Sequence, residues 1–153
     1  MAIIGVISDT HGLLRPEACD YLQGSDFIVH AGDIGSPDVV SQLQKIAPLS
    51  IVRGNIDKSP WGDEFPEVEV LKVDGKYLYI LHRLEDLDID PQAAGMNVVI
   101  SGHSHMPKEQ WLDGVLYLNP GSAGPRRFKL PVSLARLTIA DSGIRVEMKE
   151  LAV

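Results

Sequence analysis

The sequence predicts an α/β protein in which two mixed β-sheets pack together, with helices on the outside. Two observations support this fold class. Over residues 1–55, short β-branched runs alternate with segments of helical pattern, whereas later apolar runs are joined by tight turns such as Asp74-Gly75. Helical crossovers make neighbouring strands parallel, and two-residue turns make them antiparallel. The sheets are therefore expected to combine both kinds of pairing.

The parallel part is expected in the first third of the chain. Buried strands are predicted where short apolar runs occur, at residues 3–7, 27–29 and 49–52. One helix is expected to begin at Pro16 and end before Gly24, and a second to begin at Ser36-Pro37 and end before Pro48. Proline is favoured in the first turn of a helix, and the Ser36 side chain can cap the second one.

Hairpins are expected to dominate the remainder of the chain. Their turns are predicted at residues 74–75, 113–114 and 141–143, and the clearest flanking strands are residues 67–73 and 76–81. Another buried strand is expected at residues 98–100. The stretch 84–95 has a weak helical pattern that Pro91 interrupts, and a helix is expected there.

Length and composition exclude several classes of protein. A chain of 153 residues suits a single domain, residues 1–153, and can bury a sizeable core without a disulfide or a metal. No apolar run approaches the roughly 20 residues that a transmembrane helix needs, so no membrane association is expected. The net charge of −7 disfavours stable binding of nucleic acid, because an acidic surface repels phosphate backbones.

The single cysteine also limits the chemistry. Cys19 alone cannot form an internal disulfide or a multi-cysteine zinc site, and its place on a helical stripe predicts a buried, inert thiol. The N-terminal residues lack the basic start of a signal peptide, so a cytoplasmic protein is expected. The later hairpins offer unpaired strand edges to which a second copy of the chain could bind, so a homo-oligomer stays an alternative.

Polar motifs follow the predicted strands. In chain order they are Asp9-Thr10-His11, Gly32-Asp33, Gly54-Asn55-Ile56-Asp57, His82 and Gly102-His103-Ser104-His105. Each motif alone is typical of a solvated turn, but four of the five histidines fall at strand ends, where ligands bind in α/β sheets. Imidazole and carboxylate groups suit a pair of divalent ions, with one carboxylate placed between them. The motifs together therefore predict a two-metal site.

This set of motifs resembles the calcineurin-like metallophosphoesterases, and most closely their small single-domain prokaryotic YfcE-type phosphodiesterases. The opening run at residues 4–12 and the later Asn119-Pro120-Gly121-Ser122 add to the likeness. The resemblance implies a four-layer α/β fold in which two packed mixed β-sheets are flanked by helices. It also implies a metal-dependent phosphoric ester hydrolase, a phosphodiesterase that acts on a small soluble phosphate ester.

The resemblance further implies seven metal ligands in two groups that share a bridging carboxylate. They are Asp9, His11 and His105 for one ion, Asn55, His82 and His103 for the other, and Asp33 between them. In such a site a hydroxide between the two divalent ions attacks phosphorus. Manganese is the expected metal, because the donors are oxygen and imidazole without thiolate, and iron, zinc, nickel and magnesium are alternatives.

Catalytic roles are expected of Asn55, Asp57 and His82. Asn55 is also expected to bind substrate, by donating a hydrogen bond to a phosphate oxygen. Asp57 would orient a histidine ligand or assist proton transfer, and the equal alternative is a turn residue. Many relatives carry a proton-donating histidine where Ile56 stands here. We therefore expect substrates with acidic leaving groups, or protonation by water or Asp57.

The remaining polar residues have competing interpretations. Arg83 follows His82 where relatives usually have glycine, and it either binds the substrate phosphate or pairs with nearby acids, Glu85 or Asp86, as surface arginines commonly do. His30 is expected in the core or beside the ligands and not as a ligand. The basic pair at residues 126–127 could bind phosphate, although such pairs are usually solvated or ion-paired.

Two other classes of function stay open. One is a non-catalytic, protein-binding scaffold of the same fold, and the other is a nucleotidase or monoesterase. Scaffolds of this fold tend to have lost ligand histidines, whereas all four candidates are present in this chain. The acidic net charge argues against long nucleic acids but not against nucleotides.

Overall fold

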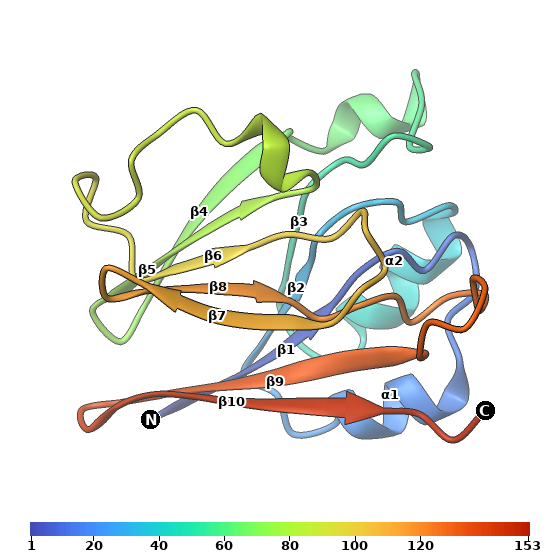
Figure 1. Cartoon of the computed structure of the whole chain (residues 1–153). Coiled ribbons are helices and arrows are strands. Elements are labelled where there is room, and N and C mark those ends of the chain that lie inside the picture. The colour runs from blue at the N-terminus through green and yellow to red at the C-terminus, as the bar shows by residue number, and fades with distance from the viewer.

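The computed structural model describes residues 1–153 and contains two five-stranded β-sheets (Figure 1). The first sheet has the order β10-β9-β1-β2-β3. Its strands are β1 (Ala2–Ile7), β2 (Phe27–His30), β3 (Leu49–Ile51), β9 (Ser133–Ala140) and β10 (Gly143–Glu150). The second sheet has the order β4-β5-β6-β8-β7. Its strands are β4 (Val68–Val73), β5 (Lys76–Leu81), β6 (Val98–Ile100), β7 (Lys108–Leu112) and β8 (Val115–Asn119).

Both sheets are mixed, as the alternation of crossovers and tight turns predicts. Strands β1, β2 and β3 are parallel, while β9 runs antiparallel to both β1 and β10. In the second sheet β5, β6 and β8 are parallel, and the hairpins β4–β5 and β7–β8 add an antiparallel strand at each edge. All three predicted hairpin turns are present, so the predicted fold class is confirmed.

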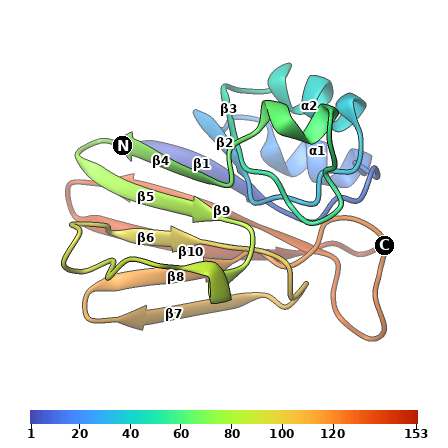
Figure 2. The same cartoon turned by 90° about the horizontal axis from the view of Figure 1, so that it is seen from above.

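Two helices cover the outer face of the first sheet (Figure 2). They are α1 (Pro16–Leu22) and α2 (Pro37–Gln44), which begin at the two predicted prolines. Ser36 occupies the predicted N-cap position of α2, but its side chain makes no capping hydrogen bond. Leu22 and Leu43 pack from these helices against Ile7 and Ile28 of the sheet, which gives the helices their buried side.

The main core lies between the two sheets. Sixteen buried residues form it, and they include Ile4 and Val6 of β1, Leu78 and Ile80 of β5, and Leu137 of β9. Side chains alternate between the two faces of a strand, so these residues point inward while their neighbours meet the helices or the solvent. None of the helices is long and apolar enough to cross a membrane.

The helix predicted at residues 84–95 is wrong. Only a single 3-10 turn, η2 (Leu84–Asp86), forms there, and a second one, η1 (Trp61–Glu64), lies in the segment before β4. The backbone before a proline disfavours the helical region, and Pro91 itself has no N–H to donate. The segment therefore crosses the second sheet as a loop, which packs Leu87 and Ile89 on a small cluster around Tyr79.

Candidate metal centre

The loops after β1 and β2 bring the first candidate ligands together. Main-chain N–H groups of Asp9 and His11 donate to the carbonyl oxygens of Gly32 and Asp33, at 3.0 and 2.9 Å. These bonds continue the parallel pairing of the two strands beyond their ends. Asp9 and Asp33 are both buried, so both carboxylates are largely shielded from solvent.

The second sheet supplies the other histidines from the loops after β5 and β6. His82 directly follows β5, and its Nδ1–H donates to the carbonyl oxygen of Ala31 at 2.7 Å, because a carbonyl oxygen can only accept. Because Nδ1 of His82 carries the ring proton, Nε2 keeps a free lone pair. The main-chain N–H of His103 donates to Oδ2 of Asp9 at 3.0 Å, which ties the loop after β6 to the first sheet. The site is thus assembled across the sheet interface.

Candidate ligands form two groups that fit the two predicted ions, apart from Asn55. Each group has three donor atoms within 4.8 Å of one another; the groups are Asp9 with His11 and His105, and Asp33 with His82 and His103. Oδ2 of Asp33 lies 3.4 Å from Nε2 of both His11 and His82, one from each group. Oδ1 of Asp9 lies 3.3 Å from Nε2 of His105. Asp33 therefore lies within reach of histidines from both groups.

Several donor atoms of these groups have no hydrogen-bond partner although they are buried. They are Oδ1 of Asp9, Nε2 of His11, Nε2 of His82 and Nδ1 of His105. Buried polar atoms are nearly always hydrogen-bonded, because an unpaired one costs free energy. Four such atoms in one cluster of carboxylates and imidazoles are explained if they bind cations. The residues present therefore fit a pair of divalent ions.

The backbone of the ligand loops is unusual. The φ angle is positive at five candidate ligands, with values of 54° at Asp9, 48° at His11, 56° at Asp33, 71° at His103 and 61° at His105. Residues other than glycine rarely adopt this left-handed region, and each such residue costs on the order of 1–3 kcal/mol. Strain of this kind gathers at functional sites, because the surrounding fold compensates for it.

Close backbone contact also explains a glycine of the histidine motif. A Cβ atom at Gly102 would lie 2.6 Å from Oδ2 of Asp9 and would collide with the Ser8 side chain. The glycine therefore permits the loop after β6 to approach Asp9, and the φ angle of Gly102 is not in the left-handed region. Close contact, and not a left-handed backbone conformation, therefore requires glycine at this position.

The carboxylates and histidines of the site perturb one another's pKa values. Burial opposes ionisation of Asp9, yet the nearby imidazoles of His105 and His11 hold the pKa of its carboxyl well below the usual range. Burial likewise disfavours a charged His82, but the carboxylates of Asp33 and Asp9 outweigh it and raise the pKa of that imidazole. Burial also opposes ionisation of Asp33, but the His82 imidazole lowers the pKa of its carboxyl, so both carboxylates are ionised at neutral pH.

The Asp57 carboxylate makes no hydrogen bond or ion pair with a histidine. Its buried carboxylate accepts hydrogen bonds from the main-chain N–H groups of Ile34, Gly35 and Gly54, at 2.9 to 3.1 Å. It thereby joins the loop after β2, which carries Asp33, to the loop after β3. These contacts favour the turn-residue interpretation over the catalytic one.

Asn55 and Arg83 lie around a hollow of about 350 Å³ beside His82. Asn55 is exposed there. Arg83 is engaged by the acids that the sequence places near it, with Nε at 3.3 Å from Glu85 and 4.0 Å from Asp86. This pairing agrees with the alternative interpretation of Arg83, a surface arginine paired with nearby acids. The predicted substrate contacts of Asn55 and Arg83 stay predictions.

His30 is a buried residue that holds loops together and not a ligand. The N–H of Gly32 donates to its Nδ1 at 3.1 Å, so the ring proton is on Nε2 and faces the Thr10 hydroxyl at 3.0 Å. That hydroxyl donates in turn to the Ile34 carbonyl at 2.8 Å. Burial lowers the pKa of His30 to about 4, which keeps the ring neutral.

Cys19 is half-buried, so the predicted burial of its thiol is too strong.

Two further residues support the ligand loops, and sequence reasoning assigned them no role. Nδ2 of Asn119 donates to the Gly102 carbonyl at 3.0 Å and to Ser104 Oγ at 3.1 Å, so it braces the histidine motif. Ser122 donates to the Asp9 carbonyl at 2.9 Å. Both belong to the Asn119–Ser122 motif, and its position after a strand, like that of the other motifs, was the signal that could have revealed them.

A family model described as the calcineurin-like phosphoesterase superfamily domain matches residues 1–142. The chain therefore belongs to the calcineurin-like phosphoesterase superfamily, as its motifs predict. A probable metallophosphoesterase of Methanothermobacter thermautotrophicus is 36% identical over 135 residues, which cover 78% of this chain and 76% of that protein. Membership of this metal-dependent family agrees with the two candidate ligand groups.

Solved structures share the fold over nearly the whole chain. An archaeal phosphodiesterase has a TM-score of 0.79 at 22% identity, covering 96% of this chain and 99% of that one. The phosphoesterase YfcE from E. coli has a TM-score of 0.68 at 22% identity, with 89% and 88% covered. Vacuolar protein sorting 29 from Cryptosporidium parvum has a TM-score of 0.77 at 19% identity, with 99% and 98% covered. The fold alone therefore does not separate enzymes from a sorting protein.

Proposed function

We propose that this protein is a two-metal phosphodiesterase that hydrolyses a small soluble phosphate ester. One observation carries the proposal: two ligand groups meet at Asp33, whose Oδ2 lies 3.4 Å from a histidine of each. A pair of divalent ions, when bound there, would supply an activated water at neutral pH and neutralise charge on the phosphoryl oxygens.

The chain's own residues are suited to hold such ions. Asp9, His11 and His105 would bind one of them, and His82, His103 and Asn55 the other, with Asp33 shared (the contribution of Asn55 rests on the family motif). Asp57, His30 and Asn119 would keep the ligand loops in register through the hydrogen bonds described above. The binding of two divalent ions would give +4 against two carboxylates, so the pocket would attract an anionic ester although the protein is acidic.

The chemistry of the donors favours manganese. Oxygen and imidazole donors without thiolate fit manganese, and iron, zinc, nickel and magnesium are the alternatives. Diester rather than monoester hydrolysis is proposed because the motifs match YfcE-type relatives and an archaeal phosphodiesterase shares the fold.

The decisive experiment combines metal content with activity. The protein is stripped with a chelator, reloaded with manganese, and tested by elemental analysis and by hydrolysis of bis(p-nitrophenyl) phosphate. Two bound ions per chain and activity only in the reloaded sample are expected. Preferential hydrolysis of p-nitrophenyl phosphate would instead make the protein a monoesterase. Tight metal binding without hydrolysis of either ester, or no metal binding at all, would contradict the proposal and favour a protein-binding scaffold.

A further inference from the structure

An exposed basic and aromatic loop lies beside the candidate metal centre. The loop, residues 124–131, is closed at its base by the pairing of Ser122 with Val132. A hollow of about 200 Å³ lies between the loop residues 125–127 and two candidate ligands, His11 and His105. The loop is therefore placed to contact whatever part of a substrate extends beyond the ligands.

The loop is held firmly at its start. Gly124 packs so closely against the main-chain oxygens of Asp9 and Thr10 that a Cβ atom there would collide with both. The guanidinium of Arg126 donates to the Leu130 carbonyl at 3.3 Å and to a Val153 main-chain oxygen at 3.1 Å. Arg126 is thus a positioning residue that sets the shape of the loop.

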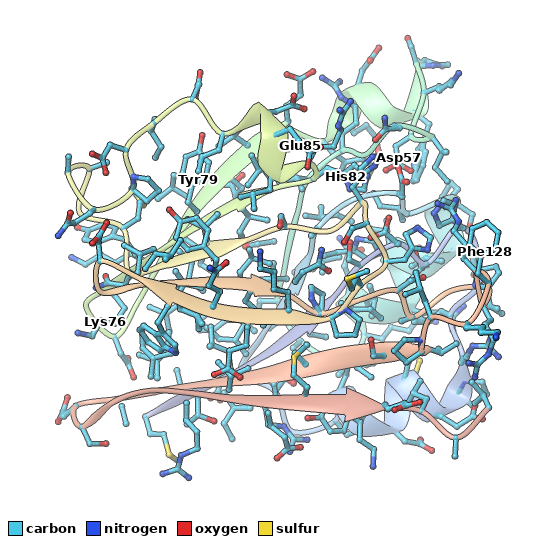
Figure 3. The ribbon with its side chains drawn as sticks, viewed as in Figure 1. Asp57, Lys76, Tyr79, His82, Glu85 and Phe128 are labelled. Atoms are coloured by element: carbon cyan, nitrogen blue, oxygen red, sulfur yellow. The ribbon has the colours of Figure 1, made fainter.

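Phe128 occupies a strained and exposed position at the tip. Its φ angle is 53°, and 89% of the residue is accessible to solvent, the highest value among the exposed large hydrophobic residues. A hydrogen bond from the Leu130 N–H to the Arg127 carbonyl at 3.1 Å closes the turn around it. Glycine or asparagine suits such a turn position, whereas a bulky residue with positive φ is an outlier there. Figure 3 shows Phe128 at the same end of the molecule as His82 and Asp57.

The residues on either side of Phe128 are cationic. Arg127 lines the hollow with His11, and no ion pair or hydrogen bond of its guanidinium is found, in contrast to Arg126. Lys129 is exposed on the other side. A protein with a net charge of −7 thus places Arg127 beside its candidate metal ligands, in a loop whose tip carries an unpacked aromatic ring. The chemistry suits a ligand that is both anionic and aromatic.

We infer that Phe128 and Arg127 form a subsite for the nucleoside of a nucleotide phosphodiester. The base would stack on the Phe128 ring, and Arg127 would contact a phosphate oxygen that points out of the metal centre. Stacking of a base on an aromatic side chain tolerates any base, because each has a π-face. The inference rests on the proposed phosphodiesterase function and names its substrate class.

The test compares two diesters that release the same leaving group. Thymidine 5′-(p-nitrophenyl phosphate) carries a nucleoside where methyl p-nitrophenyl phosphate carries a methyl group, and the two are otherwise the same. The manganese-loaded protein is expected to prefer the nucleoside ester in kcat/KM by about fivefold to a hundredfold, the range typical of base stacking. Phe128→Ala should reduce this preference to near one, and Phe128→Tyr should retain it. Arg127→Ala should lower kcat/KM for both esters, since both carry the phosphate.

The control is Trp111→Ala, which removes another exposed aromatic ring from β7, outside the residues that form the site. It should keep the preference. Hydrolysis of both esters with a preference that Phe128→Ala leaves intact would overturn the subsite while the proposed function stands. If neither ester is hydrolysed, the proposed function fails. The subsite is then tested by calorimetry. Thymidine 5′-monophosphate is expected to bind more tightly than methyl phosphate, and Phe128→Ala should abolish this difference. Equal binding of the two ligands to the unmodified protein would contradict the subsite.

Discussion

Asp33 is the residue on which the candidate centre depends most directly. Its Oδ2 contacts histidines of both groups, while its Oδ1 accepts a hydrogen bond from the Ile56 N–H at 3.1 Å. Asp33→Asn keeps the shape and loses the charge, so it should lower manganese content below two ions per chain and reduce diester hydrolysis by about a hundredfold or more. Asp20→Asn, an exposed carboxylate on α1, is the matched control and should change neither. Full metal content in Asp33→Asn would refute the shared-ligand role.

Ile56 bears on how the leaving group is protonated. Its main-chain N–H donates to Asp33, and its aliphatic side chain carries no acidic proton to give to a leaving group. Without another donor, the rate should fall steeply as the pKa of the leaving alcohol rises. The measurement is kcat/KM across diesters with graded phenol leaving groups. Ile56→His should flatten the dependence, whereas a flat dependence in the unmodified protein would show that a donor is already present.

At the residue scale, the sequence is sufficient to predict that these histidines and aspartates gather in one place, because each follows a recognisable apolar strand. The partners of Asp57 could not be predicted in this way. It lies 22 and 23 residues from two of the amides that it binds, and only the folded loops bring them together. Arg83 is the converse case, because the neighbouring acids that engage it are visible in the sequence.

At the element scale, the loop after β2 is attached to its neighbour by Asp57. Three buried or half-buried N–H groups would lose their acceptor in Asp57→Ala, at roughly 1–3 kcal/mol for each. The variant is expected to lose at least about 3 kcal/mol of unfolding free energy in urea, and Asp57→Asn, which keeps one oxygen, should lose less. If Asp57 instead acted in proton transfer, the alanine variant would keep its stability and lose activity with an altered pH profile.

His30 ties the loops after β1 and β2 together, and it makes this contact pH-dependent. Its pKa is lowered from an ordinary 6.5 to about 4 by burial, so the unfolded chain takes up a proton before the folded one does. The stability that the neutral ring contributes is complete above about pH 6.5 and is lost as pH falls toward 4, about 3 kcal/mol in all. Urea unfolding at several pH values should show a smaller loss in His30→Gln than in the unmodified protein. Equal slopes would mean that His30 is not buried as a neutral ring.

The strands and turns of the fold could be predicted from sequence more fully than its outer layer. Apolar runs and Asp-Gly turns determine the strands, because a short apolar run between turns has few other ways to be buried. The prediction of a helix at residues 84–95 is wrong because Pro91 interrupts the weak helical pattern. A loop is also sufficient to cover that face of the sheet. Leu87 and Ile89 reach that face without a helix.

At the scale of the whole molecule, the candidate ligands come from two sheets that otherwise meet through their apolar core. Asp9, His11 and Asp33 follow strands of the first sheet, and His82 and His103 follow strands of the second. Ions bound between them would join the sheets at one edge, and they would also relieve the repulsion between two buried carboxylates. Metal binding should therefore be linked to global stability, because the unfolded chain does not assemble the ligands.

The expected outcome is a rise in Tm when the chelated protein receives manganese. At a concentration a hundred times the dissociation constant, one site adds about 2.7 kcal/mol. For a domain of this size 1 kcal/mol corresponds to about 2–4 °C, so Tm should rise by about 5–10 °C for each site that fills. The comparison is made by calorimetry in the unmodified protein and in Asp9→Asn with Asp33→Asn, where the shift should vanish. An equal shift in that variant would place the stabilising ions elsewhere on this acidic surface and not between the sheets.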